Sequence, residues 1–255
     1  MKSLDNIREF PVPKPLEARQ EEIVASCIQG VDLIFLGEAH GSLEKPGEGI
    51  SPPLAEKLIE LAAKAHDPIK FIGIEAYFHP SVVPDLRYLP RGLQHLIPYI
   101  EKRQEDGIKV RYIDASPGET SISGREETIT ENITNAHEEI GRGLIIMGLD
   151  HVQPDRELLY ELSPDLEQKP TETVVKRIRG TAPKLKTASL VCKVHPLARL
   201  HGEFDPLQPT IIQSADLKLI ELDRGGGEKE FLKDGAVDLA ILYPFQSFCE
   251  EENNV

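Results

Sequence analysis

The sequence predicts an α/β fold with a mostly parallel or mixed central sheet flanked by helices. Two observations lead to this prediction. Short apolar runs alternate along the chain with longer amphipathic segments, and strands separated by helices in this order form βαβ units. The apolar runs are also continuous, as in strands buried on both faces. A binding site is then expected at the carboxyl edge of the strands, where ligands bind in open α/β sheets.

Four apolar runs in the first two thirds of the chain are predicted strands. They are residues 31–40, 69–77, 108–116 and 143–151. The helices predicted between and before them are 15–30, about 52–68, 83–107 and 124–143. Gly30 fits the end of the first helix, because glycine is common just after a helix. Pro90 and Pro98 should break the third helix into two or three short helices.

The last third of the chain has weaker patterns. Short helices are predicted at 154–162 and 171–180, and strands at 187–194, 217–223 and 237–244. The glycine-rich segment 223–235 is predicted to be a surface loop. Nothing marks a linker, so we predict a single domain over residues 1–255, with a motif-bearing core at about 31–155 and an unassigned part at 156–255.

Composition limits the classes of partner. The formal net charge is -14, which argues against a nucleic-acid partner because nonspecific binding to phosphates needs lysine and arginine. No run of about 18 apolar residues predicts a membrane span, and the N-terminal segment lacks the order of a signal peptide. These features predict a cytoplasmic protein, with a secreted effector as the alternative. Cys27, Cys192 and Cys249 form no CxxC pair, so no disulfide framework or zinc ribbon is predicted.

Acidic and histidine side chains follow the four predicted strands at the point where each apolar run stops. These residues are Glu38, His40, Glu75, Asp114, Asp150 and His151. In a parallel sheet all of these strand ends lie on one edge. The sequence therefore predicts that these side chains converge in one crevice.

Two kinds of chemistry are open to such a set of side chains. A carboxylate beside an imidazole fixes the tautomer of the ring and suits a general base acting on water near neutral pH. Alternatively, His40, Glu75 and His151 would form a divalent-metal site, because imidazole and carboxylate are normal ligands for zinc, manganese or iron. The residue pattern does not choose between water activated by a metal and water activated by side chains alone.

The helix predicted before the fourth strand carries a further polar residue. Ser123 and Glu126 match a capping box, in which Glu126 would bond back to the start of the helix. Arg125 and Asn132 share a stripe with apolar residues such as Ile129 and so face the sheet. A buried guanidinium needs an acidic or oxyanion partner, and the strand-end carboxylates are the candidates.

Four segments resemble a known superfamily. FLGEAHGSLE, IEAY, REETITENI and IIMGLDHV are similar to sequences of the group that joins erythromycin esterase, the haem-binding lipoprotein ChaN, the Tiki and TraB proteins and a domain of certain bacterial toxins. Tiki and TraB proteins carry two GxxH motifs with a glutamate between them. Gly37 to His40, Glu75 and Gly148 to His151 match that pattern, and the resemblance covers about residues 31–155.

The resemblance implies a polar cleft in a mixed α/β fold and, in several members, hydrolysis of a macrolide lactone or of peptide bonds, with or without metal. Glu38, His40, Glu75 and His151 match the catalytic or metal-binding set, and Arg125 matches the arginine of the helix. We therefore predict a hydrolase of ester or amide bonds acting on a small-molecule or peptide substrate. The alternatives are a haem- or metal-binding protein of the ChaN type without turnover, and a toxin-like effector peptidase. The chain lacks the export signal expected of ChaN and the membrane anchor expected of Tiki.

Overall fold

The structure is a computed structural model of the chain. It describes residues 16–38, 52–76, 86, 89, 96–115, 122–152, 157–158, 171–195, 210–213, 219–222, 228–232 and 238–244. The helices are α1 Ala18–Ile28, α2 Pro52–Lys64, α3 Ile97–Glu105, α4 Ile122–Ile140, α5 Leu149–Val152 and α6 Val174–Thr181. The strands are β1 Leu33–Glu38, β2 Phe71–Ile74, β3 Lys109–Tyr112, β4 Gly143–Gly148, β5 Glu157–Leu158, β6 Thr171–Glu172, β7 Thr187–His195, β8 Thr210–Gln213, β9 Leu219–Leu222, β10 Glu228–Leu232 and β11 Leu239–Pro244.

Seven of these strands form one sheet in the order β3-β2-β4-β1-β7-β11-β8. All neighbouring pairs from β3 to β11 are parallel, and β8 joins β11 in the antiparallel direction. The predicted α/β fold with a mostly parallel, mixed sheet is therefore confirmed. Strands β9 and β10 form a separate antiparallel pair, as do β5 and β6.

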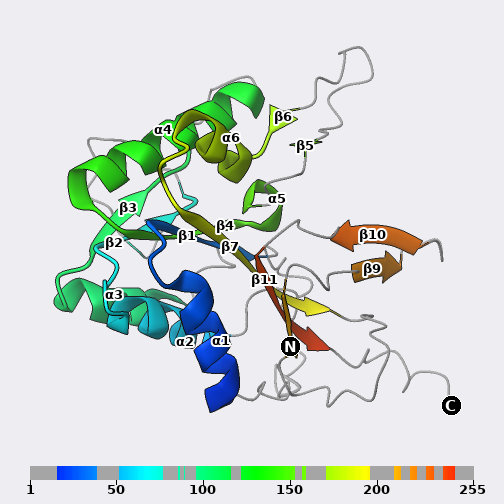
Figure 1. The fold of residues 1–255 in the computed structure, drawn as a ribbon. Helices are drawn as coiled ribbons and strands as arrows, with labels where there is room; N and C mark the ends of the chain where they lie inside the picture. The colour runs from blue at the N-terminus through cyan, green and yellow to red at the C-terminus, as the bar shows by residue number, and fades with distance from the viewer. Residues whose placement is uncertain are drawn as a thin grey trace, which may run out of the picture.

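Helices cover both faces of the sheet. Helices α1, α2 and α3 lie on one face, and α4 and α6 lie on the other (Figure 1). Successive residues of β1 point to opposite faces: Ile34 and Leu36 join the core under α1 and α2, whereas Leu33 and Phe35 join the core under α4 and α6. Burial on both sides explains why the strand sequences are continuous apolar runs.

The four strands that carry the predicted site lie side by side in the sheet. Glu38 at the end of β1 pairs with Gly148 at the end of β4, and Ile74 of β2 pairs with Ile146 of β4 and with Tyr112 of β3. The carboxyl ends of β1, β4, β2 and β3 are thus level along one edge. This alignment is what brings residues from four distant parts of the chain to one place.

Pro98 lies in the first turn of α3, where a missing N–H costs nothing, so a short helix begins at this proline, as predicted. Pro90 lies outside the described residues. Two other local predictions differ from the structure, because residues 157–158 form β5 instead of a helix, and 228–232 form β10 instead of a loop. Strand β10 is held by backbone pairing with β9, a partner that lies outside the glycine-rich segment from which the loop was predicted. The helix predictions at α1, α2, α4 and α6 are confirmed.

The other end of the sheet is tied together by one buried arginine. Arg142 precedes β4 and is 6% exposed. Its guanidinium donates to the carbonyl oxygens of Ile28 at 2.6 Å and Val31 at 2.7 Å, and also to that of Asp67. One side chain therefore links the start of β4 to the connections that precede β1 and β2. No helix in the described part of the chain is long and apolar enough to cross a membrane.

Candidate active site

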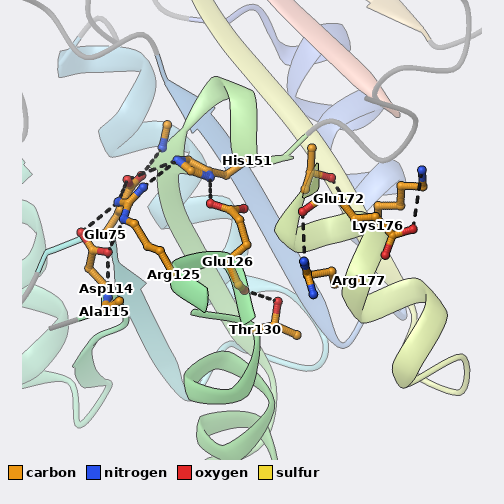
Figure 2. A network of polar contacts seen from close by, with 12 residues as sticks. Glu75, Asp114, Ala115, Arg125, Glu126, Thr130, His151, Glu172, Lys176 and Arg177 are labelled. Atoms are coloured by element: carbon orange, nitrogen blue, oxygen red, sulfur yellow. Dashed lines mark hydrogen bonds and ion pairs between the residues drawn. The ribbon is translucent and has the colours of Figure 1, made fainter. Parts of the chain in front are cut away.

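Arg125 is at the centre of a cluster of charged side chains at the carboxyl edge of the sheet (Figure 2). It lies near the start of α4, and its Nε and Nη2 atoms donate to the two carboxylate oxygens of Asp114 at 2.8 and 2.9 Å. Nη2 also donates to Oε1 of Glu75 at 2.6 Å. Two of the strand-end carboxylates predicted as partners of this arginine, Glu75 and Asp114, thus contact it.

Glu75 follows β2 directly and is held at both carboxylate oxygens. Oε1 accepts from Arg125, and Oε2 accepts the backbone N–H of Gly148 at 2.5 Å. The side chain is 6% exposed. Such a carboxylate has a fixed orientation, because hydrogen bonds from a guanidinium and a buried amide restrain it from two sides.

His151 lies on α5, which packs against β1 and α6. Its Nε2 atom is 3.3 Å from Nη1 of Arg125 and 3.5 Å from Oε1 of Glu75. Its Nδ1 atom is 2.7 Å from Oε1 of Glu126. Burial alone would lower the pKa of this imidazole, but the carboxylates of Glu126 and Glu75 outweigh burial and the repulsion of Arg125, so its pKa is raised.

Glu126 was predicted to cap the start of α4, and that prediction is wrong. Helix α4 begins at Ile122, and the Glu126 side chain turns away from the helix start toward His151 (Figure 2). The side chain is 0% exposed. The 2.7 Å separation between Oε1 of Glu126 and Nδ1 of His151 is a close polar contact, although neither Glu126 oxygen nor this Nδ1 atom makes a well-formed hydrogen bond among the described residues.

The sequence did carry a signal for this role of Glu126. Residues 126, 129, 130 and 133 are spaced by three and four, which places them on one helical stripe. Ile129 and Ile133 of this stripe are fully buried, and Thr130 is 7% exposed. A glutamate on the buried stripe of a helix needs a partner in the core. Because Glu126 was assigned to a capping box, no such partner was predicted for it.

Exposure increases across the cluster from Glu126 to Arg125. The side chains of Glu75 and His151 are 6% and 7% exposed, Asp114 is 20% exposed, and Arg125 is 30% exposed. Glu126, Glu75 and His151 are therefore the buried part of the cluster, and Asp114 and Arg125 are its more exposed part.

Charge and contacts hold the guanidinium in place. Burial alone would lower the pKa of Arg125, but its hydrogen bonds to Asp114 and Glu75 outweigh that effect and raise it. Asp114 also accepts the backbone N–H of Ala115 at 2.7 Å. Asn132, predicted to share the face of Arg125, donates to the carbonyl oxygen of Ile113 at 3.1 Å. It thus ties α4 to the end of β3 and contacts none of the acidic groups described in the cluster.

The remaining predicted residues are described only in part. The backbone of Glu38 lies between Gly148 and Cys192 in the sheet, and Asp150 lies in α5, but their side chains fall outside what the structure describes. His40 lies outside the described residues altogether. The structure therefore brings together Glu75, Asp114, Arg125 and His151, which are half of the predicted crevice together with its arginine.

The placed residues do not fit a metal ion in their present arrangement. Within the described ranges, no group of three or more His, Cys, Asp and Glu residues is placed to hold one. The guanidinium of Arg125 occupies the position between Glu75, Asp114 and His151 that a cation would take. A divalent ion bound to Oε1 of Glu75 would meet a positive charge 2.6 Å from its ligand. The predicted ligand set of His40, Glu75 and His151 stays a prediction, because His40 is not described.

Comparison with solved structures identifies the fold. A crystal structure of a Bacillus cereus protein superposes with a TM-score of 0.60 at 7% sequence identity, covering 92% of this chain and 94% of that one. A histidine-to-asparagine mutant of the erythromycin esterase EreC, in its open conformation, superposes with a TM-score of 0.59 at 9% identity, covering 91% of this chain and 95% of that one. The predicted erythromycin esterase-like fold is thereby confirmed.

Comparisons of sequence, in contrast, assign the chain to no family. No protein-family model matches the chain, and no curated protein matches its sequence. At 7% and 9% identity the likeness shows the fold alone. The predicted relation to ChaN, Tiki and TraB stays a prediction.

Proposed function

We propose that this chain is a hydrolase of ester or amide bonds in which His151 activates a water molecule beside Glu75. The observation that carries the proposal is the arrangement of polar groups around the His151 imidazole. A buried carboxylate lies 2.7 Å from its Nδ1, while its Nε2 faces Glu75 and Arg125. A carboxylate that orients an imidazole, which in turn faces a second polar group, is the common arrangement of a general base and its orienting partner. The erythromycin esterase-like fold supports the same class of reaction.

In the proposed reaction, neutral His151 accepts a proton at Nε2 from water. The water oxygen attacks the carbonyl carbon of the substrate, and negative charge develops on the carbonyl oxygen. Arg125 has five N–H groups, and one on Nη1 has no partner among the described residues, so it can donate to that oxyanion. The bond to the leaving oxygen or nitrogen then breaks, and the leaving group takes the proton from Nε2.

Arg125 supplies a positive charge at the place where a metal-dependent hydrolase would have its ion. Its ion pairs with Glu75 and Asp114 hold that charge close to Nε2 of His151. Fixed cationic donors stabilise a developing oxyanion without reorganising. We therefore propose that the reaction proceeds without a metal.

The proposal is tested with a panel of simple esters, a macrolide lactone and peptides, assayed with and without a chelator. Glu75→Gln and His151→Gln should each lower kcat/KM by about 10²–10⁴-fold, the usual contribution of a general acid or base. Glu139→Gln is the matched control, because Glu139 lies on α4 in an exposed ion pair with Arg111 and should leave activity unchanged. Hydrolysis that survives both site substitutions would refute the proposal.

Two further measurements separate the alternatives. Elemental analysis of the purified protein, repeated on His40→Ala, tests the predicted metal ligands, because a metal present at one equivalent and lost in that variant would contradict the metal-free reaction. A haem Soret band on adding haem, in a protein with no turnover of any substrate in the panel, would favour the haem-binding alternative.

A further inference from the structure

We infer that Glu126 is a positioning residue of this site: it holds the proton of His151 on Nδ1 and thereby directs Nε2 toward Glu75. The inference rests on the proposed function for its effect on rate. Its effect on the imidazole itself can be measured in a protein with no detectable activity.

The first step is the burial of Glu126. The side chain is 0% exposed, and it lies one helical turn before Ile129 on the stripe of α4 that packs on the sheet. A carboxylate in such a place is costly unless a partner compensates its charge. The structure gives it one partner among the described residues, His151 at 2.7 Å.

The second step is the position of the proton on His151. An ionised carboxylate only accepts hydrogen bonds, and Nδ1 lies 2.7 Å from Oε1 of Glu126, so we assign the hydrogen of the neutral ring to Nδ1. The lone pair of Nε2 can then accept from Nη1 of Arg125, 3.3 Å away. In the charged ring the second proton is on Nε2 and faces Oε1 of Glu75 at 3.5 Å. Proton exchange with the site therefore takes place at Nε2 in either case.

The third step accounts for every described charge that faces the ring. Glu126 and Arg125 approach it from α4, and Glu75 approaches from the end of β2. Both carboxylates stabilise the imidazolium, whereas Arg125 and burial oppose it. Of the two carboxylates, Glu126 is nearer by 0.8 Å, the difference between 3.5 and 2.7 Å, and it alone contacts Nδ1. It should thus control the tautomer of the ring.

Glu126→Gln removes the charge and keeps the shape. An amide can donate as well as accept, so the amide introduced by this substitution would donate to Nδ1 of His151 and move the proton of the neutral ring to Nε2. That tautomer has no lone pair facing Glu75 and cannot take a proton from water there. Replacing the orienting carboxylate of a serine-protease triad by an amide costs about 10⁴-fold in kcat, and we expect kcat/KM to fall by at least about 10²-fold here.

The test is nitrogen-15 NMR of the histidine rings in the full-length chain, with the His151 signals assigned from their loss in His151→Gln. Above the pKa of His151 the wild-type ring should show hydrogen on Nδ1. In Glu126→Gln the hydrogen should move to Nε2. Glu139→Gln should not change the tautomer. A wild-type ring with hydrogen on Nε2 would overturn the inference without any variant, and so would a Glu126→Gln ring with an unchanged tautomer.

The two hypotheses fail in different ways. A wild-type Nδ1–H tautomer that depends on Glu126, in a protein that hydrolyses nothing in the panel, would leave the positioning role intact and refute the hydrolase. Hydrolysis that depends on His151 but is unchanged in a folded Glu126→Gln variant would refute the positioning role and leave the hydrolase intact. If Glu126→Gln does not fold, the wild-type tautomer decides the question alone.

Discussion

Arg125 offers a direct test of how burial changes the strength of an ion pair. Two arginine–glutamate pairs in the described part of the chain have almost equal lengths. Nη2 of Arg125 lies 2.6 Å from Glu75, and Nη2 of Arg111 lies 2.7 Å from Glu139. The first pair is 30% and 6% exposed, and the second is 38% and 61% exposed. Replacing each arginine by methionine therefore compares a partly buried arginine, which also donates to Asp114, with a more exposed arginine in a single ion pair.

The expected costs differ by several-fold. Breaking a buried pair by removing one partner costs about 3–5 kcal/mol because it leaves a buried charge uncompensated. Since Arg125 is partly exposed, we expect a somewhat smaller cost, about 2–4 kcal/mol, for Arg125→Met. An exposed pair contributes about 0–1 kcal/mol, so Arg111→Met should cost less than about 1 kcal/mol.

Urea unfolding followed by circular dichroism measures both costs from the shift of the midpoint at constant slope. The slope must be the same in wild type and variants, since a change in slope would report a change in the denatured state. Equal losses in the two variants would refute the reasoning, because distance alone would then set the strength of the pair. A loss below about 1 kcal/mol in Arg125→Met, the value of an exposed pair, would show that the site tolerates its carboxylates without the guanidinium.

Three further predictions concern stability. Because the pKa of His151 is raised, the folded state binds the proton of this imidazole more tightly than the unfolded chain does. The tighter binding stabilises the folded state fully below the ordinary histidine pKa of about 6.5. This stabilisation is lost as pH rises through the raised pKa of the folded state. The unfolding free energy of wild type relative to His151→Gln should fall over that pH interval, and a flat difference would contradict the raised pKa. Arg142→Met should cost about 3–5 kcal/mol in urea unfolding, because it removes charged hydrogen bonds to three carbonyl oxygens; a loss under about 1 kcal/mol would show that water replaces them. Gly143→Ala would place a Cβ in steric overlap with the ring of Phe71 and should cost about 1–3 kcal/mol by overpacking, seen as a lower melting temperature, whereas unchanged melting would mean that the ring can move aside.

Much of the fold could be predicted because local patterns determine it. The four strands predicted in the first two thirds of the chain each form a strand of the sheet, at 33–38, 71–74, 109–112 and 143–148. Gly30, with φ of +66°, follows the first helix as expected. The order of the strands could not be read in the same way. Strand β4 lies between β1 and β2, and this order depends on how helices pack across the whole sheet.

The same distinction between local patterns and distant contacts applies to the candidate site. Glu75, Asp114 and His151 were predicted from their positions at strand ends, and the pairing of Arg125 with strand-end carboxylates was predicted from its place on the helix. Glu126 was assigned to a local motif, because a capping box is defined by four consecutive residues whereas its observed partner, His151, is far away in the chain.

The position of β4 also affects the order in which the protein can assemble. Strands β1 and β2 come first in the chain, yet each pairs with β4 and they have no ladder with one another in the described sheet. A chain that is being synthesised and has not yet reached residue 143 lacks β4, the strand that pairs with both. Glu75 then also lacks the backbone N–H of Gly148 that restrains its carboxylate. Contacts between residues this far apart carry the entropic cost of closing a long loop before they form. The pairing of β4 with β1 and β2 and the orientation of the Glu75 carboxylate therefore depend on the same step of assembly.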